Sequence, residues 1–144
     1  MKTIDASVWI AATGSSTGAS ALVLALCQHG YAKVVSSRLV LLESERNIRE
    51  KLGEHALLRF YQEIADLDLD LVETPTSQEI ATQSHIIDPK DAHVLAAGLK
   101  GKVKVLLPLD RMHFLIPSVL DAGLQFKIMT PGDFLRGFLS SEER

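Results

Sequence analysis

The 144-residue sequence is 47% hydrophobic and carries a formal net charge of −3 at pH 7. This is about the length of one ordinary domain, so we expect a single domain over residues 1–144 rather than two separate cores. Because Cys27 is the one cysteine, an intramolecular disulfide is excluded, and because no apolar run approaches the roughly 20 residues of a membrane span, we expect a cytoplasmic protein without a membrane segment.

Strand-like and helix-like patterns alternate along the whole chain. In chain order we predict a strand that ends near Asp5, a short helical segment (8–12), a helix (19–29), a strand (32–36), two helices (38–52, 55–66), a strand (67–72), two helices (77–84 and 89 to about 98), a strand (103–107), a turn or short helix through Phe114, a helix (118–122), a strand (126–129) and a helix (131–138). Such alternation predicts a three-layer α/β/α fold with a mainly parallel sheet. Strict alternation of Leu and Asp in residues 67–70 predicts an edge strand with one wet face.

Two common ligand-binding motifs are excluded by the residues present. The small-residue loop at residues 14–18 lacks the Lys that a P-loop needs after its last glycine, where this chain has Ala19. The five histidines form no close helical pair, and there is no second cysteine to join them, so we do not expect a zinc site.

Four acidic residues stand where a parallel sheet would present them at one edge. Asp5 and Asp110 each end a predicted strand, Asp91 lies at the start of a predicted helix, and Glu43 interrupts an apolar helical run. Clustered carboxylates repel one another unless cations neutralise them, and hard oxygen ligands select Mg²⁺ or Mn²⁺. With a phosphodiester beside the ion, the natural chemistry is hydrolysis. Ser7, two residues after Asp5, could hold a metal-bound water or cap a helix.

Each acid also has an ordinary structural explanation. Asp91 could satisfy the start of a helix that has Asp88 as its cap and Pro89 at its first position. The other three could cap turns or form ion pairs: Asp5 in a turn, Asp110 capping the segment through His113, and Glu43 with Arg46 or Arg38.

The negative net charge implies that any contact with nucleic acid is local. Nucleic acid could contact a patch of five basic residues. It could also bind beside the acids once a cation has neutralised them, and the two modes of binding are compatible. The patch consists of Lys33, Arg38, Arg46, Arg49 and Lys51.

In order and spacing, these segments resemble the PIN-domain ribonucleases, which include the toxins of many bacterial toxin–antitoxin pairs. The resemblance covers most of the chain and rests on five segments: Thr3 to Val8 with Asp5, Ser37 to Glu43, Asp88 to Ala97 with Asp91, Leu106 to Phe114 with Asp110, and the closing Thr130-Pro131-Gly132-Asp133-Phe134-Leu135.

The resemblance implies a fold, an activity and partners. It implies a five-stranded parallel sheet and a Mg²⁺ or Mn²⁺ ion held by Asp5, Glu43, Asp91 and Asp110. It also implies cleavage of RNA by metal-activated water, frequent homodimerisation, and an antitoxin protein as the partner of a toxin.

The chain departs from the family pattern beside Asp110. Pro108 stands where members commonly have Thr or Ser, and Arg111, Met112 and His113 occupy positions where many have a further acid. These departures keep open a second hypothesis, a degenerate PIN module that binds RNA or a protein without cleaving it. A receiver-like signalling domain is a third, remote hypothesis, because the expected acidic pair after the first strand is a single Asp5.

Overall fold

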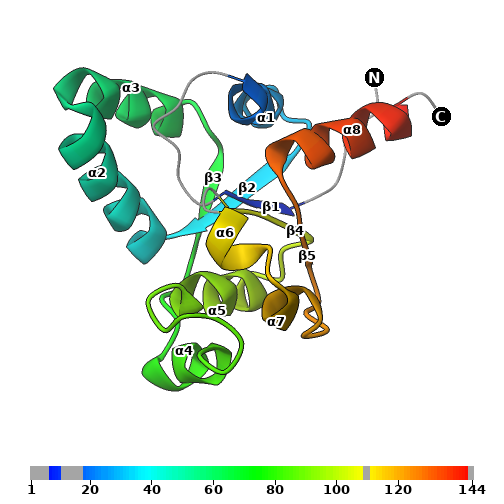
Figure 1. Ribbon diagram of the computed structural model, residues 1–144. Helices are drawn as coiled ribbons and strands as arrows, with labels where there is room; N and C mark the ends of the chain where they lie inside the picture. The colour runs from blue at the N-terminus through cyan, green and yellow to red at the C-terminus, as the bar shows by residue number, and fades with distance from the viewer. Residues whose placement is uncertain (1–6, 11–17, 109–110, 143–144) are drawn as a thin grey trace.

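A computed structural model describes residues 7–10, 18–108 and 111–142 of the chain (Figure 1). The order of its elements alternates as an α/β chain should. The elements are β1 (Ser7–Ile10), α1 (Gly18–Gln28), β2 (Lys33–Ser37), α2 (Arg38–Leu52), α3 (Glu54–Ala65), β3 (Leu69–Val72), α4 (Ser77–Gln83), α5 (Ala92–Lys100), β4 (Val105–Leu107), α6 (Arg111–Phe114), α7 (Pro117–Leu120), β5 (Lys127–Ile128) and α8 (Pro131–Glu142).

The five strands form one parallel sheet in the order β3-β2-β1-β4-β5. This confirms the predicted three-layer fold, the five-stranded parallel sheet and the edge position of β3. The chain builds the sheet outward from β1 through β2 to β3, then crosses back to add β4 and β5 on the other side. The direction of winding therefore switches between β1 and β4, and open sheets of this kind bind ligands at the carboxyl ends of the strands there.

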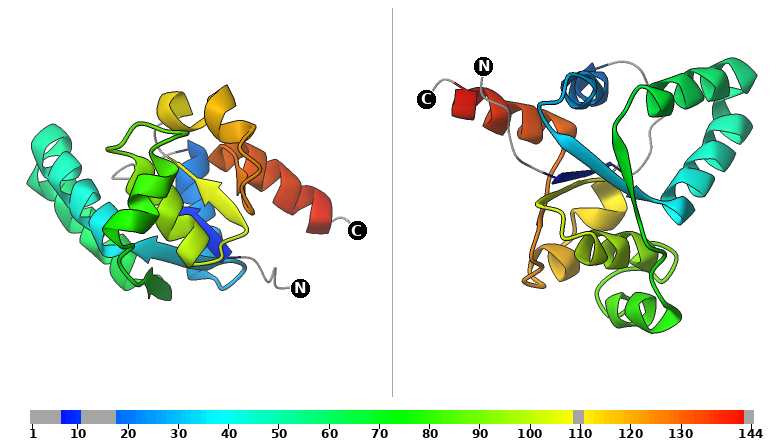
Figure 2. Two further views of the ribbon diagram at one scale, coloured as in Figure 1. Left: turned by 90° about the horizontal axis from the view of Figure 1, so that it is seen from below. Right: turned by 180° about the vertical axis from the view of Figure 1, so that it is seen from behind.

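Helices cover both faces of the sheet (Figures 1 and 2). α1 and α8 lie on one face, where Val23, Cys27 and Phe134 pack against Val34 and Leu107. α4, α5 and α7 lie on the other face, over the larger core. That core is a cluster of twelve buried residues: Val35, Val40, Ile87, Ala92, Val94, Leu95, Ala97, Val103, Leu106, Phe114, Val119 and Phe126.

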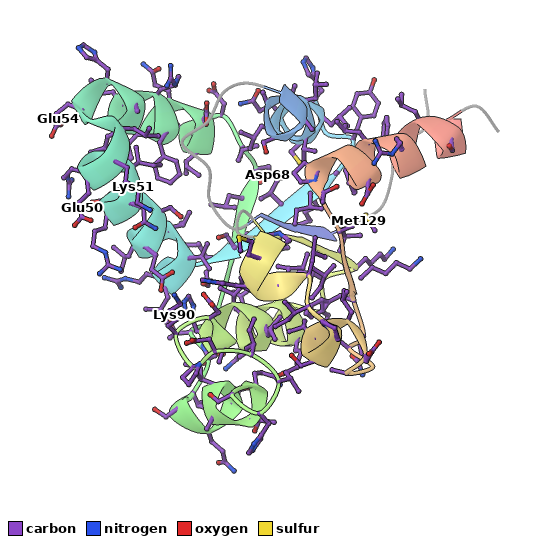
Figure 3. The ribbon with its side chains drawn as sticks, viewed as in Figure 1. Glu50, Lys51, Glu54, Asp68, Lys90 and Met129 are labelled. Atoms are coloured by element: carbon purple, nitrogen blue, oxygen red, sulfur yellow. The ribbon has the colours of Figure 1, made fainter. Side chains whose placement is uncertain are left out.

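The pair α2 and α3 extends from the side of the sheet and has a small core of its own, made by Ile48, Ala56, Leu57 and Phe60. Gly53 joins the two helices with a φ of 86°, a conformation that favours glycine. In Figure 3, Glu50, Lys51 and Glu54 lie near this junction, away from the sheet. The outer end of α2 is therefore remote from the carboxyl ends of β1 and β4.

The structure corrects the predicted start of the chain. Residues Ser7–Ile10 form β1, so the segment at residues 8–12, predicted to be helical, is a strand as far as it is described. Val8, Trp9 and Ile10 are β-branched or aromatic, and pairing with both β2 and β4 favours the strand. The described strand therefore follows Asp5 in the chain instead of ending near it, and Asp5 itself lies outside the described residues.

The start of α5 is also corrected. The helix begins at Ala92 with Asp91 in the N-cap position, whereas Pro89 was predicted as its first residue. Asp88 does not cap α5, because its side chain accepts a hydrogen bond from the backbone N–H of Lys90 at 3.0 Å and so closes a separate turn. Pro89 therefore belongs to that turn and not to the first turn of α5.

None of the described helices combines the length and apolar character needed to cross a membrane.

Candidate functional site

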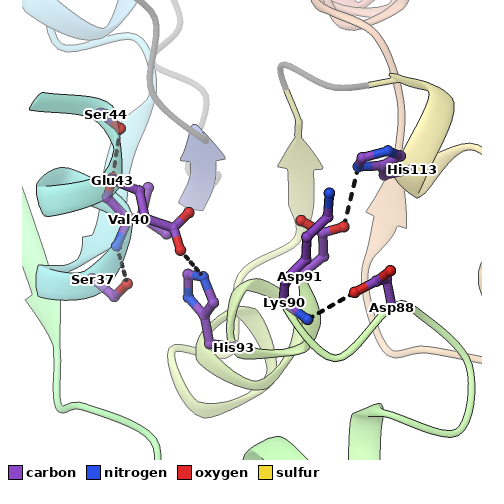
Figure 4. A network of polar contacts seen from close by, with 9 residues as sticks. All are labelled: Ser37, Val40, Glu43, Ser44, Asp88, Lys90, Asp91, His93 and His113. Carbon is purple, nitrogen blue, oxygen red and sulfur yellow. Dashed lines mark hydrogen bonds and ion pairs between the residues drawn. The ribbon is translucent and has the colours of Figure 1, made fainter. Parts of the chain in front are cut away.

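The candidate site lies where α2 and α5 begin, near the carboxyl ends of the central strands (Figure 4). β2 leads directly from Ser37 into α2, and α6 follows β4 after Pro108 and two residues that the structure does not describe. Two of the four predicted acids, Glu43 and Asp91, are described here. Asp5 and Asp110 lie outside the described residues, and Ser7 is described only as the first backbone position of β1.

The start of α2 is fixed by an N-cap at Ser37. The Ser37 hydroxyl accepts a hydrogen bond from the backbone N–H of Val40 at 3.2 Å, and Ser37 is 1% exposed. Val40, Ser44 and Ile48 form the buried stripe of the helix, and the Ser44 hydroxyl donates to the carbonyl of Val40. Glu43 flanks this stripe with a half-exposed side chain, so its carboxylate stands at the border between core and solvent.

The carboxylate of Glu43 contacts a buried histidine. Its Oε1 lies 2.8 Å from Nε2 of His93, which belongs to α5 and is 50 residues further along the chain. His93 is 7% exposed, and its other ring nitrogen, Nδ1, has no hydrogen-bond partner among the described residues. The tautomer that satisfies this contact carries its proton on Nε2 and donates it to Glu43. Arg38 and Arg46, the predicted alternatives, are not the partners found.

Asp91 lies at the N-cap of α5, two residues before His93. Its side chain makes no cap hydrogen bond, and Asp91 precedes the helix instead of lying inside a first turn capped by Asp88, as the structural explanation predicted. Instead, Oδ2 of Asp91 lies 3.2 Å from Nδ1 of His113 on α6. The Asp91 side chain is 18% exposed and that of His113 is 40% exposed, so this pair also stands at the border with solvent.

The contact between Glu43 and His93 brings the two described acids to the same region. His93 follows Asp91 by two residues, so the Glu43 carboxylate is bonded to the first turn of the helix that Asp91 precedes. Figure 4 shows both acids around the ends of β1 and β4. Within residues 7–10, 18–108 and 111–142, no three His, Cys, Asp or Glu side chains are close enough to hold a metal ion by themselves. The donors of the described pair are carboxylate oxygens, which suit Mg²⁺ and Mn²⁺.

His93 was not predicted as a residue of the site. The sequence feature that could have indicated it is a polar residue inside an otherwise apolar helix, two residues after Asp91, because a buried polar side chain needs a hydrogen-bond partner. His113, on α6, is a second histidine of the site, because it contacts Asp91.

A thiol nucleophile is excluded by the position of Cys27. It is buried between α1 and α8, and burial raises the pKa of its thiol to about 12. The neutral thiol is a poor nucleophile, so Cys27 does not supply one to this site.

Comparison with known families agrees with the architecture. The family model described as PIN domain matches residues 3–112, most of the chain. The chain belongs to the PIN-domain family. PIN domains are generally nucleases and typically use divalent metal ions. No curated protein matches the sequence.

The PIN-domain site of this chain has the departure that its sequence predicts beside β4. Pro108 is fully buried, so the position where the resemblance led us to expect Thr or Ser offers no side-chain oxygen. Among the three positions where many members have a further acid, Met112 is 84% exposed and His113 contacts Asp91. At one of these three positions, therefore, an imidazole lies beside Asp91.

Two members of the basic patch considered for this PIN domain have acidic partners. Lys33 forms an ion pair with Asp70 at 2.7 Å, and Arg49 forms one with Glu45 at 3.3 Å. Arg38 is exposed at the start of α2.

Proposed function

We propose that this PIN domain is a metal-dependent endoribonuclease that hydrolyses RNA phosphodiester bonds. The observation that carries the proposal is the meeting of Glu43, from α2, with the start of α5 beside Asp91. Two carboxylates from distant parts of the sequence thus share the strand edge at which parallel sheets bind ligands.

Asp5, Glu43, Asp91 and Asp110 would together hold one or two Mg²⁺ or Mn²⁺ ions. When bound, such an ion supplies an activated water and offsets negative charge on the phosphate. The protein fixes Glu43 through His93 and Asp91 through His113. Ser7 is proposed to orient a water of the ion.

Recognition of RNA is proposed to be local. Arg38 begins α2 and Lys90 precedes Asp91 directly, and both are exposed. Cations at these two positions flank the acids and can meet the phosphates on either side of the scissile bond.

Purified protein incubated with single-stranded RNA and Mn²⁺ or Mg²⁺ tests this function. We expect internal cleavage that a chelator stops, that Asp91→Asn abolishes, and that a DNA oligonucleotide of the same sequence does not undergo. Absence of metal-dependent RNA cleavage by the wild-type protein, freed of any bound inhibitor, contradicts the proposal.

Burial of Pro108 favours a second candidate, a PIN domain that binds RNA or a protein without cleaving it. The site then lacks one oxygen next to β4. Pro108→Thr distinguishes the two candidates: if the site is degenerate, wild-type protein is inactive and the substitution creates Mn²⁺-dependent cleavage. If the site is competent, wild-type protein already cleaves.

We further propose that the nuclease is the toxin of a toxin–antitoxin pair and forms a homodimer. The closing segment Thr130 to Leu135, which resembles that of many members, supports this proposal and leads into α8, which begins at Pro131. Growth arrest on expression, absent for Asp91→Asn and relieved by the product of an adjacent gene, is the expected result. Light scattering of the purified protein would give the dimer mass.

A further inference from the structure

We infer that His93 is a positioning residue for Glu43, and so sets how well the site binds its divalent ion. This inference rests on the proposed function. The contact joins Nε2 of His93 to Oε1 of Glu43 at 2.8 Å, and both residues are labelled in Figure 4. His93 touches the proposed ion ligand and does not itself take the place of one.

The surroundings of His93 are unsuited to a polar side chain. All residues from Ala92 to Gly98 are buried, and apart from His93 they are small or aliphatic. Burying an imidazole is unfavourable unless its polar atoms are paired, and Nδ1 has no hydrogen-bond partner within the described ranges. Leu at position 93 would avoid this penalty, so the polar residue is explained by what it does for Glu43.

The hydrogen bond restricts a carboxylate that is otherwise mobile. The Glu43 side chain is 45% exposed and extends from the flank of α2, where glutamate normally samples several rotamers. Binding of Oε1 by His93 selects one of them and leaves the second carboxylate oxygen for an ion. Hydrogen-bond partners outside the ligand shell act in this way at many metal sites.

His93 also joins α2 to α5, so it could serve stability alone. The two roles predict different measurements. A purely structural residue changes the denaturation midpoint of the metal-free protein but leaves the Mn²⁺ affinity of the folded protein unchanged. A positioning residue changes the affinity, and the change depends on the presence of the Glu43 carboxylate.

The experiment measures the Mn²⁺ dissociation constant of the full chain by electron paramagnetic resonance, together with urea denaturation of the metal-free protein. We expect His93→Leu to weaken Mn²⁺ binding about 10- to 100-fold. His93→Gln, whose amide N–H can replace Nε2, should restore most of the affinity. In a Glu43→Gln background, His93→Leu should have no further effect on Mn²⁺ binding.

Equal Mn²⁺ affinity of folded His93→Leu and wild-type protein overturns the inference and leaves the proposed function standing. If His93→Leu does not fold, His93→Asn replaces it, because its shorter amide cannot reach Glu43, and the same comparison applies. Absence of Mn²⁺ binding by wild-type protein overturns the proposed metal site and this inference with it.

Discussion

Glu43 on α2 and His93 on α5 lie 50 residues apart in the sequence, and their side chains meet at 2.8 Å. Neither helix could place its residue without the sheet between them. β2 ends where α2 begins, at the buried cap Ser37, and the apolar residues of α5 fix its rotation against the core. A hydrogen bond at the candidate site is therefore a consequence of the packing of the whole domain.

Removal of the hydrogen-bond acceptor at position 43 should destabilise the protein more than removal of the negative charge alone. Glu43→Ala leaves the buried Nε2–H of His93 unpaired, and such a loss costs about 1–3 kcal/mol in the free energy of unfolding. Glu43→Gln retains an oxygen that accepts this hydrogen bond, so it should change the free energy of unfolding by less. Urea denaturation of both variants measures the difference, and equal midpoints would show that the hydrogen bond contributes nothing to stability.

The end of α5 offers a packing prediction at Gly101. A Cβ atom there would lie 2.7 Å from Cγ2 of Val72 and 3.2 Å from Cγ1 of Val35. Both neighbours are β-branched and stiff, so Gly101→Ala should lower the free energy of unfolding by about 1–3 kcal/mol. The matched control is Gly98→Ala, where the nearest atoms belong to the ring of Phe126 at 3.4 Å.

The control should be less destabilised than Gly101→Ala, because 3.4 Å is close to an ordinary contact. Val72→Ala in the Gly101→Ala background should recover part of the lost stability, since it removes the atom that is approached most closely. A Gly101→Ala variant as stable as Gly98→Ala would mean that β3 shifts freely away from α5.

Stability at acid pH should depend on Glu79 at the start of α4. The backbone N–H of Thr76 donates to its carboxylate at 2.8 Å and the ammonium of Lys100 lies at 2.9 Å, and these partners lower the pKa of Glu79 below its usual 4.5. The unfolded chain therefore takes up this proton at a higher pH than the folded protein does. The stabilisation is present above pH 4.5 and is lost as the pH falls through the lowered pKa.

Glu79→Gln should accordingly flatten the decline of the denaturation midpoint below pH 4.5. The control, Glu50→Gln, removes an exposed carboxylate near the outer end of α2. The same acid dependence in wild type and Glu79→Gln would exclude Glu79 as a source of the pH effect.

Local signals in the sequence predicted much of the fold. The helix predicted over residues 38–52 and the alternation that predicts β3 each depend on neighbouring residues, and both are confirmed. The apolar run at residues 8–10 fits a strand or a helix equally well when read alone. Pairing with β2 and β4, which are distant in the sequence, decides for a strand.

Contacts between distant residues explain what could not be predicted at the site. Glu43 and Asp91 were predicted as acids of one site, and their histidine partners come from α5 and α6. Nothing in the local sequence of α2 indicates that Glu43 meets His93 rather than Arg46 or Arg38. The contact follows from the packing of α2 and α5 around β2.

Asp91 should be essential for cleavage and nearly dispensable for folding. Its side chain makes no cap bond to α5, so Asp91→Asn should change the free energy of unfolding by no more than the roughly 1 kcal/mol of a charge at a helix start. The proposed role as an ion ligand predicts a loss of RNA cleavage beyond the roughly 10- to 100-fold seen when a hydrogen-bond partner of a metal ligand is removed.

Asp88→Asn is the matched control. The side chain of Asp88 closes a turn by accepting a hydrogen bond from the Lys90 N–H, and the side-chain carbonyl of an asparagine can still accept it. It should cleave at close to the wild-type rate. Cleavage by Asp91→Asn at the rate of Asp88→Asn would remove Asp91 from the site, whereas equal loss in both variants would point to the shape of the turn rather than to either charge.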